Sequence, residues 1–242
     1  MDKGDIMNEL KLSKRLYTVA NFIPSGAVLA DIGSDHAYLP CFAAINGKVQ
    51  KAIAGEVVEG PYQSAVKQVE RTGLTSRIDV RKGDGLSVLR PSEATCVTIA
   101  GMGGGLIAKI LEEGKSKLDQ TERLILQPNV NANFIRTWLI ENGWELIHEE
   151  ILEEDLKIYE VLVAEKGDPL HPYNGKKQES AILFGPFLME EKNEVFIKKW
   201  SHEKRHWESV AAQIAKGKTT DESTSRREEM ETLITMASEV LE

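Results

Sequence analysis

The sequence predicts an α/β protein in which a mostly parallel, doubly wound sheet ends in an antiparallel hairpin and is followed by a helical extension. Strand-like and helix-like segments alternate from residue 28 to residue 142, which is typical of βαβ units. Two strand-like runs, 144–151 and 158–164, then follow one another with no helix between them. After residue 177 the composition changes to helix formers and charged residues. These three observations define the predicted fold class.

The alternating region is expected to open with a helix and to continue with five short strands. Apolar residues between Leu10 and Ala20 recur at helical spacing, and Pro24-Ser25-Gly26 favours a turn that ends this helix. The strands are mostly apolar, as parallel strands are when helices cover both faces of a sheet. The expected strands are 28–33, 51–57, 78–81, 96–100 and 124–127, and the expected helices between them are 37–46, 62–71, 106–113 and 134–142.

The last two strands require a different connection. Only the segment 152–157 separates the run 144–151 from the run 158–164. A crossover between parallel strands needs about a dozen residues or more. We therefore expect these two strands to pair antiparallel, so that the parallel sheet ends with one terminal antiparallel strand.

Changes in composition predict the domain organisation. Residues 1–166 are expected to form the α/β domain with its N-terminal helix, residues 167–177 a proline-punctuated linker, and residues 178–242 the helical extension. Apolar residues recur at three-, four- and seven-residue steps from Phe196 to Ile214 and again from Met230 to Val240. This spacing predicts two long helices in the extension.

The junction of these two helices predicts a hairpin. Gly217 favours a helix end, and Thr220 or Asp221 favours the next helix start. The pair is therefore expected to fold back as an antiparallel coiled-coil hairpin. Trp200 and Trp207 are expected to fill its seam or its junction with the first domain, and stacking on nucleobases is the alternative.

Composition excludes several classes of protein. The chain is 41% hydrophobic and 28% charged, and no apolar run approaches the roughly 20 residues that span a bilayer. Because the N-terminus also lacks the features of a secretory signal, we expect a cytoplasmic protein with no membrane contact. Cys41 and Cys96 are too few for a disulfide framework or a zinc site, so we expect buried thiols and no metal. The net charge of −8 gives no basic footprint and is mild evidence against a nucleic-acid partner.

The segment Asp31-Ile32-Gly33-Ser34-Asp35-His36 has the position of a nucleotide-binding loop, because it follows a buried strand and precedes a helix. The dinucleotide fingerprint G-x-G-x-x-G is not met, since Gly33 is the only one of its three glycines that is present. A carboxylate at Asp35 opposes a pyrophosphate but suits a cofactor with a cationic ammonium and sulfonium, as in S-adenosylmethionine. Helix capping or turn bonding by Asp31 and Asp35 is the alternative.

Further candidate residues stand at the ends of the next strands. Glu56 ends the second strand, where a carboxylate can accept hydrogen bonds from ribose hydroxyls. Asp84, between Gly83 and Gly85, is a candidate for the adenine amino group, with a structural turn as the alternative. The run 100–105 contains four glycines, which let main-chain groups line a narrow slot. It is not a phosphate loop, because no Lys-Ser/Thr pair follows.

Six motifs carry a resemblance to a known family. They are Leu12-Ser13-Lys14-Arg15-Leu16, the stretch from Asp31 to Pro40, Gly55-Glu56-Val57, Gly83-Asp84-Gly85-Leu86, Ile99-Ala100-Gly101-Met102-Gly103-Gly104 and Leu126-Gln127-Pro128-Asn129. With these motifs the chain resembles, over essentially its whole length, the bacterial tRNA (adenine-22-N1) methyltransferase family called TrmK. The resemblance implies a Rossmann-like class I methyltransferase domain, a C-terminal helical coiled hairpin and methylation of N1 of adenine 22 in tRNA. The predicted antiparallel ending of the sheet is likewise more similar to a methyltransferase than to a dehydrogenase.

The strand-end motifs provide the predicted site residues. N1 of adenine has its own lone pair, so positioning is expected to dominate catalysis and no general base is required. The candidate catalytic residues are Asp31, His36 and Asn129; a structural role at the helix start is the alternative for His36. The predicted contacts to S-adenosylmethionine are Asp31, Gly33, Ser34, Asp35, His36, Tyr38, Leu39, Glu56, Val57, Gly83, Asp84, Gly85, Ala100, Gly101, Met102, Gly103 and Gly104. Tyr38 is also a candidate wall for the target base, which must leave its stack.

Local clusters of basic residues are the candidates for binding tRNA. They are Lys11, Lys14, Arg15, Arg136, Lys198, Lys199, Lys204 and Arg205, and solvated helix faces are the alternative interpretation of each. A monomer or a weak homodimer through the helical hairpin is expected. A small-molecule methyltransferase, a non-catalytic RNA-binding protein and, least favoured, a nicotinamide oxidoreductase are the competing functions.

Overall fold

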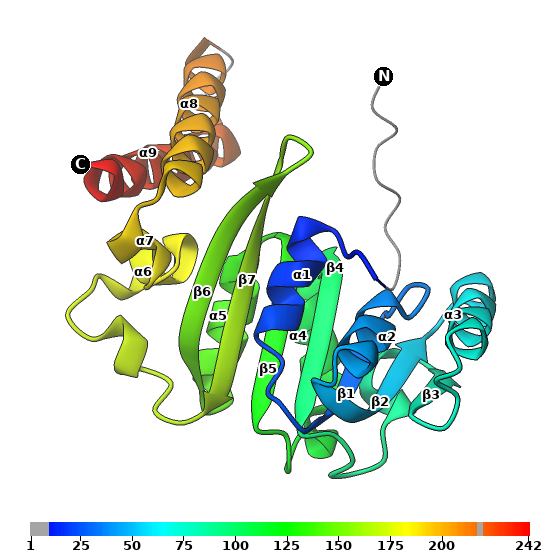
Figure 1. Ribbon diagram of the computed structural model, residues 1–242. Coiled ribbons are helices and arrows are strands. Elements are labelled where there is room, and N and C mark those ends of the chain that lie inside the picture. Colours follow the sequence, from blue (N-terminus) through cyan, green and yellow to red (C-terminus); the bar gives the residue numbers. More distant parts are fainter. Residues whose placement is uncertain (1–9, 217–219) are drawn as a thin grey trace, which may run out of the picture. The chain divides into compact units, whose positions relative to one another are not determined.

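The computed structural model describes residues 10–216 and 220–242. The chain divides into two compact units, Met1–Pro172 and Tyr173–Glu242, which we call the sheet unit and the helical unit. The sheet unit is a seven-stranded sheet with helices on both faces, and the described part of the helical unit is helices and their connections (Figure 1).

The strand order of the sheet is β3-β2-β1-β4-β5-β7-β6. Pairing is parallel from β3 to β5, whereas β7 is antiparallel to both of its neighbours. The predicted antiparallel hairpin is confirmed, and β7, the last strand in sequence, inserts between β5 and the edge strand β6. The strands are β1 Ala27–Ile32, β2 Val49–Glu56, β3 Ile78–Lys82, β4 Cys96–Gly103, β5 Arg123–Val130, β6 Trp144–Glu154 and β7 Lys157–Lys166.

Helices cover both faces of this sheet: α1 and α2 lie in front of it, and α4 and α5 behind it (Figure 1). Apolar residues of α1, α2 and α3 pack on the strands in one continuous core cluster. β1, β2, β5 and the first half of β4 are largely buried, which explains their mostly apolar sequences, whereas the edge strand β3 buries only Ile78. The helices and 3-10 turns are α1 Lys14–Asn21, α2 Tyr38–Ile45, α3 Glu59–Arg71, η1 Gly85–Val88, α4 Gly104–Glu113, η2 Lys115–Lys117 and α5 Ala132–Glu141.

The first helix begins later than its apolar pattern predicts. Leu10 is exposed and lies outside the helix, whereas Leu12 is buried. Ser13 sets the start, because its side chain caps the helix by accepting a hydrogen bond from the Leu16 N–H. α1 therefore runs only from Lys14 to Asn21.

Arg136 is not available to RNA, which corrects one predicted contact. The side chain is fully buried on α5 and forms ion pairs with Glu149 of β6 at 2.6 Å and Glu160 of β7 at 2.5 Å. A buried charge is tolerated only when it is paired, and these carboxylates supply the counter-charge. Arg136 thus ties α5 to the terminal hairpin of the sheet.

Both cysteines are buried thiols outside any disulfide, as the composition predicted. Burial raises the pKa of the Cys96 thiol to about 12. Over the described part of the chain, no helix is long and apolar enough to cross a membrane.

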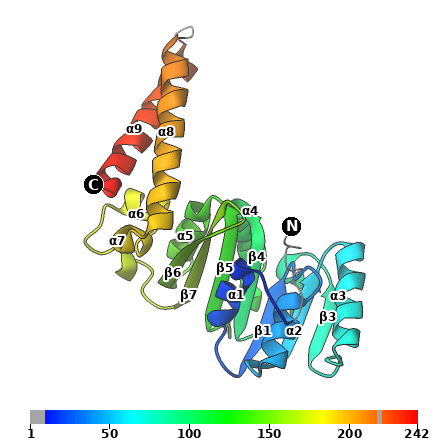
Figure 2. The ribbon, with the colours of Figure 1, turned by 45° about the horizontal axis from the view of Figure 1, so that its top comes forward.

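The helical unit begins with short elements that the sequence did not predict and continues with two long helices. The short elements are η3 His171–Tyr173, which straddles the unit boundary, α6 Gln178–Phe184 and α7 Leu188–Glu191. α8 Glu194–Lys216 and α9 Asp221–Leu241 pack on one another, and the chain returns along α9 after running up α8 (Figure 2). Coiled-coil packing of this pair remains a prediction.

A side-chain cap starts α9, and the two tryptophans of α8 differ in burial. Thr220 starts α9 with a capping box, its hydroxyl accepting from the Ser223 N–H while the Ser223 hydroxyl accepts from the Thr220 N–H. Gly217 lies outside the described residues. Trp200 is buried, with its ring centroid 4.6 Å from that of Phe184, and Trp207 is half-buried at 6.3 Å from Trp200. Trp200 is therefore a core residue, although its ring packs against Phe184 of α6 and the predicted place in the hairpin seam stays a prediction.

Candidate active site

A cavity opens at the carboxyl edge of the parallel strands. Its volume of about 350 Å³ is within the range typical of small-ligand sites. The ends of β1, β2 and β4 reach it, as does α1, the helix that precedes β1. Its lining residues are Arg15, Leu16, Asp31, Gly33, Ser34, Asp35, Leu39, Glu56, Val57, Pro61, Ala100, Gly101 and Met102.

Asp31 is the most deeply buried carboxylate of this cavity. Its Oδ1 accepts a hydrogen bond from the Thr98 hydroxyl at 2.6 Å, and its Oδ2 accepts one from the Ser34 hydroxyl at 2.5 Å. Burial raises the pKa of Asp31, although both hydrogen bonds and the nearby Arg15 act in the opposite direction. A buried carboxylate held in this way is ready to pair with a cation.

The loop after β1 has an unusual backbone. Gly33 adopts φ +71°, and Asp35, His36 and Ala37 follow with φ of 35°, 59° and 54°. Such left-handed values in residues other than glycine cost free energy and are concentrated at functional sites. The turn directs the Asp35 N–H to the Glu56 carboxylate, while the Gly33 N–H donates to the Gly55 carbonyl at 2.9 Å. The loop is thereby fastened to the end of β2.

Glu56 forms the second acidic corner of the cavity. Its side chain is buried and accepts the hydrogen bond from the Asp35 N–H. Burial raises the pKa of Glu56, and the neighbouring Asp35 and Asp31 carboxylates raise it further. The clustering of three carboxylates at one cavity favours a ligand that carries positive charge.

The glycine run ends β4 and begins α4, and two amide side chains of β5 fix it. Gln127 is fully buried and its Oε1 accepts from the Gly101 N–H at 3.0 Å. The Asn129 Nδ2 donates to the Gly101 carbonyl at 2.8 Å. Gly101 itself adopts φ +80°, which glycine permits at no steric cost. The peptide groups that line the slot are therefore held from both sides.

Arg15 is the cation of the cavity, a position that the sequence interpretation missed. Its Nη1 donates to Gln127 Oε1, and its guanidinium carbon lies 5.4 Å from the centroid of the Tyr159 ring. The backbone N–H groups of Lys14 and Arg15 donate to the Glu154 carboxylate, which fixes the start of α1. The cavity thus offers a guanidinium close to Asp31, an arrangement that matches a zwitterionic amino-acid group.

Comparison with known proteins agrees with this geometry. Residues 29–239 match the family described as TrmK, tRNA (adenine(22)-N(1))-methyltransferase. A Bacillus subtilis protein of that name is 55% identical over 236 residues, covering 98% of this chain and 99% of the relative. This chain belongs to the TrmK family.

Solved structures of TrmK-family proteins share the whole architecture. The crystal structure of the B. subtilis tRNA methyltransferase TrmK is 54% identical with a TM-score of 0.94, covering 96% of this chain and 100% of that one. A candidate tRNA methyltransferase from Streptococcus pneumoniae, in complex with S-adenosyl-L-methionine, is 45% identical with a TM-score of 0.84, covering 95% and 99%. The Rossmann-like methyltransferase class of the sheet unit is confirmed.

Within this TrmK-family chain, most of the predicted cofactor residues lie around the cavity, but not all. The cavity lining leaves out the predicted cofactor residues His36, Tyr38, Gly83, Asp84, Gly85, Gly103 and Gly104, and also Asn129, which was predicted as a catalytic residue. The His36 ring stacks on Tyr38, with centroids 5.3 Å apart. Gly104 has a packing role, because a Cβ there would lie 1.9 Å from the Asn131 carbonyl oxygen. Leu16 and Pro61 line the cavity without having been predicted, although Leu16 belongs to one of the family motifs.

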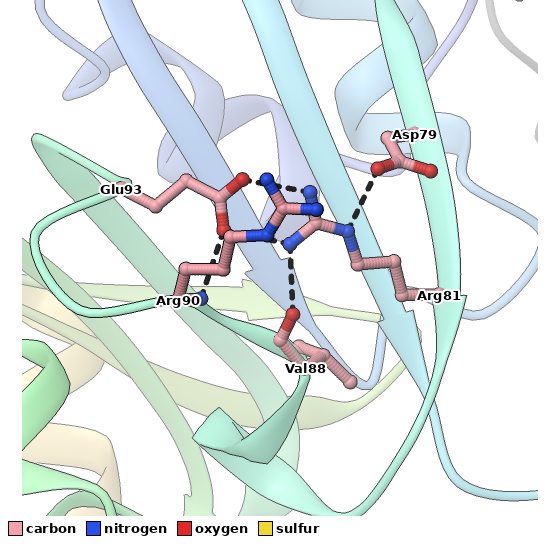
Figure 3. A network of polar contacts seen from close by, with 5 residues as sticks. All are labelled: Asp79, Arg81, Val88, Arg90 and Glu93. Carbon is pink, nitrogen blue, oxygen red and sulfur yellow. Dashed lines mark hydrogen bonds and ion pairs between the residues drawn. The ribbon is translucent and has the colours of Figure 1, made fainter.

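The turn that carries Asp84 is positioned by two sets of contacts. The Gly83 N–H donates to the Glu56 carbonyl at 2.8 Å, so the turn lies at the same edge as the cavity. After this turn the segment is bound to β3, because Arg81 of β3 forms two hydrogen bonds with Glu93 and a third with the Val88 carbonyl (Figure 3). The Arg81 guanidinium holds the pKa of Glu93 at about 2. This network anchors the segment between β3 and β4.

The predicted RNA contacts differ in their surroundings. Lys11 and Lys14 are exposed near the start of α1, and the Lys14 Nζ donates to the Glu153 carbonyl at 3.2 Å. On α8, Lys198 and Arg205 are exposed, whereas Lys199 and Lys204 are half-buried. Lys199 places its Nζ 4.5 Å from the centroid of the Trp200 ring. Of the predicted RNA contacts, Arg136 is thus buried and Arg15 lines the cavity, whereas the others are exposed or half-buried.

Proposed function

We propose that this protein transfers the methyl group of S-adenosylmethionine to N1 of adenine 22 in tRNA. The single observation that carries the proposal is the carboxylate-lined slot at the ends of β1, β2 and β4, in a chain that belongs to the TrmK family. The similar B. subtilis protein is named for this reaction, and the similar S. pneumoniae protein was solved with this cofactor.

The residues of the cavity fit the cofactor by charge. S-adenosylmethionine supplies an electrophilic methyl carbon on a sulfonium and also carries an ammonium and a carboxylate. Asp31 and Asp35 suit the positive groups, whereas the Arg15 guanidinium suits the carboxylate. Glu56 suits the ribose hydroxyls because it lies at the end of β2 and accepts hydrogen bonds. This fit supports S-adenosylmethionine over a dinucleotide, whose pyrophosphate would meet three carboxylates.

The reaction asks the protein mainly to position the base. The N1 lone pair forms the new bond to the methyl carbon while the carbon–sulfur bond breaks and its electron pair stays on sulfur. No proton has to be removed, so no general base is assigned. The adenine ring becomes positive, and nearby carboxylates stabilise that charge as it develops. We assign Asp31 to this electrostatic role, and His36 and Asn129 to contacts with the base at the rim of the slot.

Binding of tRNA is proposed to use Lys11 and Lys14 of the sheet unit and Lys198, Lys199, Lys204 and Arg205 of the helical unit. Arg15, the third predicted cation near the start of α1, lines the cavity and is assigned to the cofactor instead. Cations placed in this way neutralise phosphates without requiring a positive net charge. The proposed substrate implies a cytoplasmic enzyme. A monomer or a weak homodimer through the helical unit is proposed, and light scattering coupled to gel filtration would measure which forms.

The decisive experiment combines the purified protein with labelled cofactor and tRNA transcripts. We expect 1-methyladenosine at position 22, mapped by mass spectrometry, and no methylation of a matched transcript with guanine at that position. Methylation of small molecules but of no transcript would instead indicate a small-molecule methyltransferase. Cofactor binding in calorimetry without any turnover would indicate a non-catalytic RNA-binding protein.

A further inference from the structure

Three large apolar side chains lie exposed at the carboxyl edge of the sheet, on segments that adjoin the cavity assigned to the cofactor. Leu106 is 51% exposed, Val130 60% and Phe134 52%. Leu106 lies in the first turn of α4, Val130 at the end of β5 and Phe134 in the first turn of α5. We call these three residues the apolar shelf.

The apolar shelf adjoins the glycine run directly. A Cβ on Gly103 would lie 3.9 Å from Cγ2 of Val130, and a Cβ on Gly105 would lie 3.9 Å from Cδ2 of Phe134. Gly101 and Met102, immediately before Gly103, line the cavity. Val130 and Phe134 therefore lie against the glycine run, whose first residues line the cavity.

The exposure of Phe134 is not explained by packing within the protein. α5 buries Ala132, Ile135, Trp138 and Leu139, which share one face of the helix. Phe134 lies outside this buried stripe and presents half of its surface to solvent. Single exposed apolar residues are common on proteins, but three exposed on segments that adjoin the glycine run indicate a binding surface.

We infer that the apolar shelf binds an unstacked nucleobase of the tRNA, with Phe134 as the stacking side chain. An adenine within a folded RNA must leave its stack to reach a slot of this kind, and an aromatic ring replaces the lost stacking. The absence of side chains at Gly103 and Gly105 leaves the approach from the slot to the shelf open. The inference rests on the proposed function, because it takes tRNA as the substrate.

Substitutions of Phe134 test the inference through steady-state methylation of an adenine-22 transcript. We expect Phe134→Ala to lower kcat/KM for tRNA by roughly 5- to 150-fold, as loss of one base–aromatic stack does. Phe134→Leu is expected to remain impaired, and Phe134→Tyr to restore kcat/KM to within about threefold, since only the latter retains a ring. Calorimetric affinity for S-adenosylmethionine and the thermal midpoint should stay unchanged, because Phe134 is exposed.

Ile45→Ala serves as the matched control. Ile45 is 43% exposed at the end of α2, which runs from the carboxyl edge of the sheet to the opposite edge. This variant should methylate tRNA like the unmodified protein. A Phe134→Ala enzyme with unchanged kcat/KM, or full restoration by Phe134→Leu, would overturn the stacking role.

A binding measurement separates this inference from the proposed function. In a transcript with 2-aminopurine at position 22, stacking on Phe134 should quench the fluorescence when the unmodified protein binds, and Phe134→Ala should not quench it. If the unmodified protein methylates no transcript, the proposed function fails, and quenching that depends on the ring still supports the shelf. Methylation at position 22 with equal quenching by both proteins would refute the shelf alone.

Discussion

Among single residues, Asp31 is the one whose carboxylate is most deeply buried in the acidic site. Its two oxygens accept hydrogen bonds from Thr98 and Ser34, and the side chain is buried beside the guanidinium of Arg15. Removing a carboxylate from water costs free energy that neutral hydroxyls offset only in part. A cationic ligand group would offset the rest of this cost, so we expect the Asp31 carboxylate to contribute to ligand affinity more than to the stability of the fold.

Replacing this carboxylate by an amide should weaken cofactor binding. For Asp31→Asn we expect the Kd for S-adenosylmethionine to rise by roughly 10- to 150-fold, the effect of losing a charge-assisted hydrogen bond. Isothermal titration calorimetry measures this change directly. Asp119→Asn, which alters an exposed carboxylate before β5, is the control and should leave the Kd unchanged. Equal Kd values for Asp31→Asn and the unmodified protein would remove Asp31 from the cofactor site.

The raised pKa values of Asp31 and Glu56 predict a pH dependence of cofactor affinity. Burial places both above their ordinary values of 3.8 and 4.5. The ionised forms bind the cationic cofactor, so affinity should be full well above these shifted pKa values and fall as the pH decreases through them. Calorimetric titrations over a pH series should show this loss, and Asp31→Asn should make it shallower. An affinity that stays constant down to about pH 4 would contradict the prediction.

At the scale of elements, the segment between β3 and β4 depends on Arg81 and Glu93. Their double hydrogen bond lowers the pKa of Glu93 to about 2 from 4.5. Because the folded-state pKa is depressed, this pair stabilises the protein fully above pH 4.5 and loses its contribution as the pH falls toward 2. The turn with Asp84 belongs to this segment, so its position depends on the pair as well.

Glu93→Gln should lower the free energy of unfolding and remove part of the decrease in stability that the unmodified protein shows at low pH. We expect a loss of roughly 1 to 2 kcal/mol near neutral pH, because a shielded bidentate pair contributes more than an exposed one. Urea denaturation at several pH values measures both effects. The exposed residue Glu122 gives the matched variant, Glu122→Gln, which should behave like the unmodified protein. A Glu93→Gln protein with an unchanged free energy of unfolding would show that the pair is not stabilising.

The contact of α5 with the terminal hairpin depends on the buried Arg136. Replacing it with methionine leaves Glu149 and Glu160 buried without the cation that pairs with both. We expect Arg136→Met to destabilise the fold by roughly 3 to 5 kcal/mol, measured by urea denaturation. Adding Glu149→Gln and Glu160→Gln to this variant should recover most of the loss, since both buried charges are then removed. Loss of tRNA affinity at full stability would instead support the original RNA-contact interpretation.

At the scale of the whole molecule, a chain of net charge −8 is proposed to bind a polyanion. Long-range attraction cannot provide this affinity, so clustered cations in direct contact with phosphates have to. In the helical unit, α8 carries Lys198, Lys199, Lys204 and Arg205 within about two turns of helix.

Neutralising these four α8 residues to glutamine should weaken tRNA binding and flatten its salt dependence. If each neutralises one phosphate, the slope of log K against log salt should decrease by about 3 to 4. Filter binding or anisotropy at several salt concentrations measures the slope. Lys115→Gln with Lys117→Gln, in η2 after α4, is the control and should leave the slope unchanged. An unchanged slope in the fourfold variant would exclude α8 from the RNA surface.

Local sequence patterns predicted the order of strands and helices in the sheet unit and the acidic character of the site, but not α6 and α7. Apolar runs, glycines and prolines act locally, so β1 to β7 were predicted with errors of a few residues at their ends. Asp31 and Glu56 were identifiable because parallel strands bring their carboxyl ends to the same edge of a sheet. Local sequence patterns were sufficient to predict those features that depend on interactions between residues close in the chain.

The surroundings of Arg15 and Arg136 depend on contacts between distant parts of the chain, which local sequence does not reveal. Arg15 and Arg136 both looked like surface cations, yet Arg15 lines the cavity and Arg136 is buried between two carboxylates. Arg15 is positioned by Gln127, 112 residues away along the chain, and Arg136 by glutamates 13 and 24 residues away. Whether a charge faces water or a partner depends on which strands become neighbours, and that information is absent from local sequence.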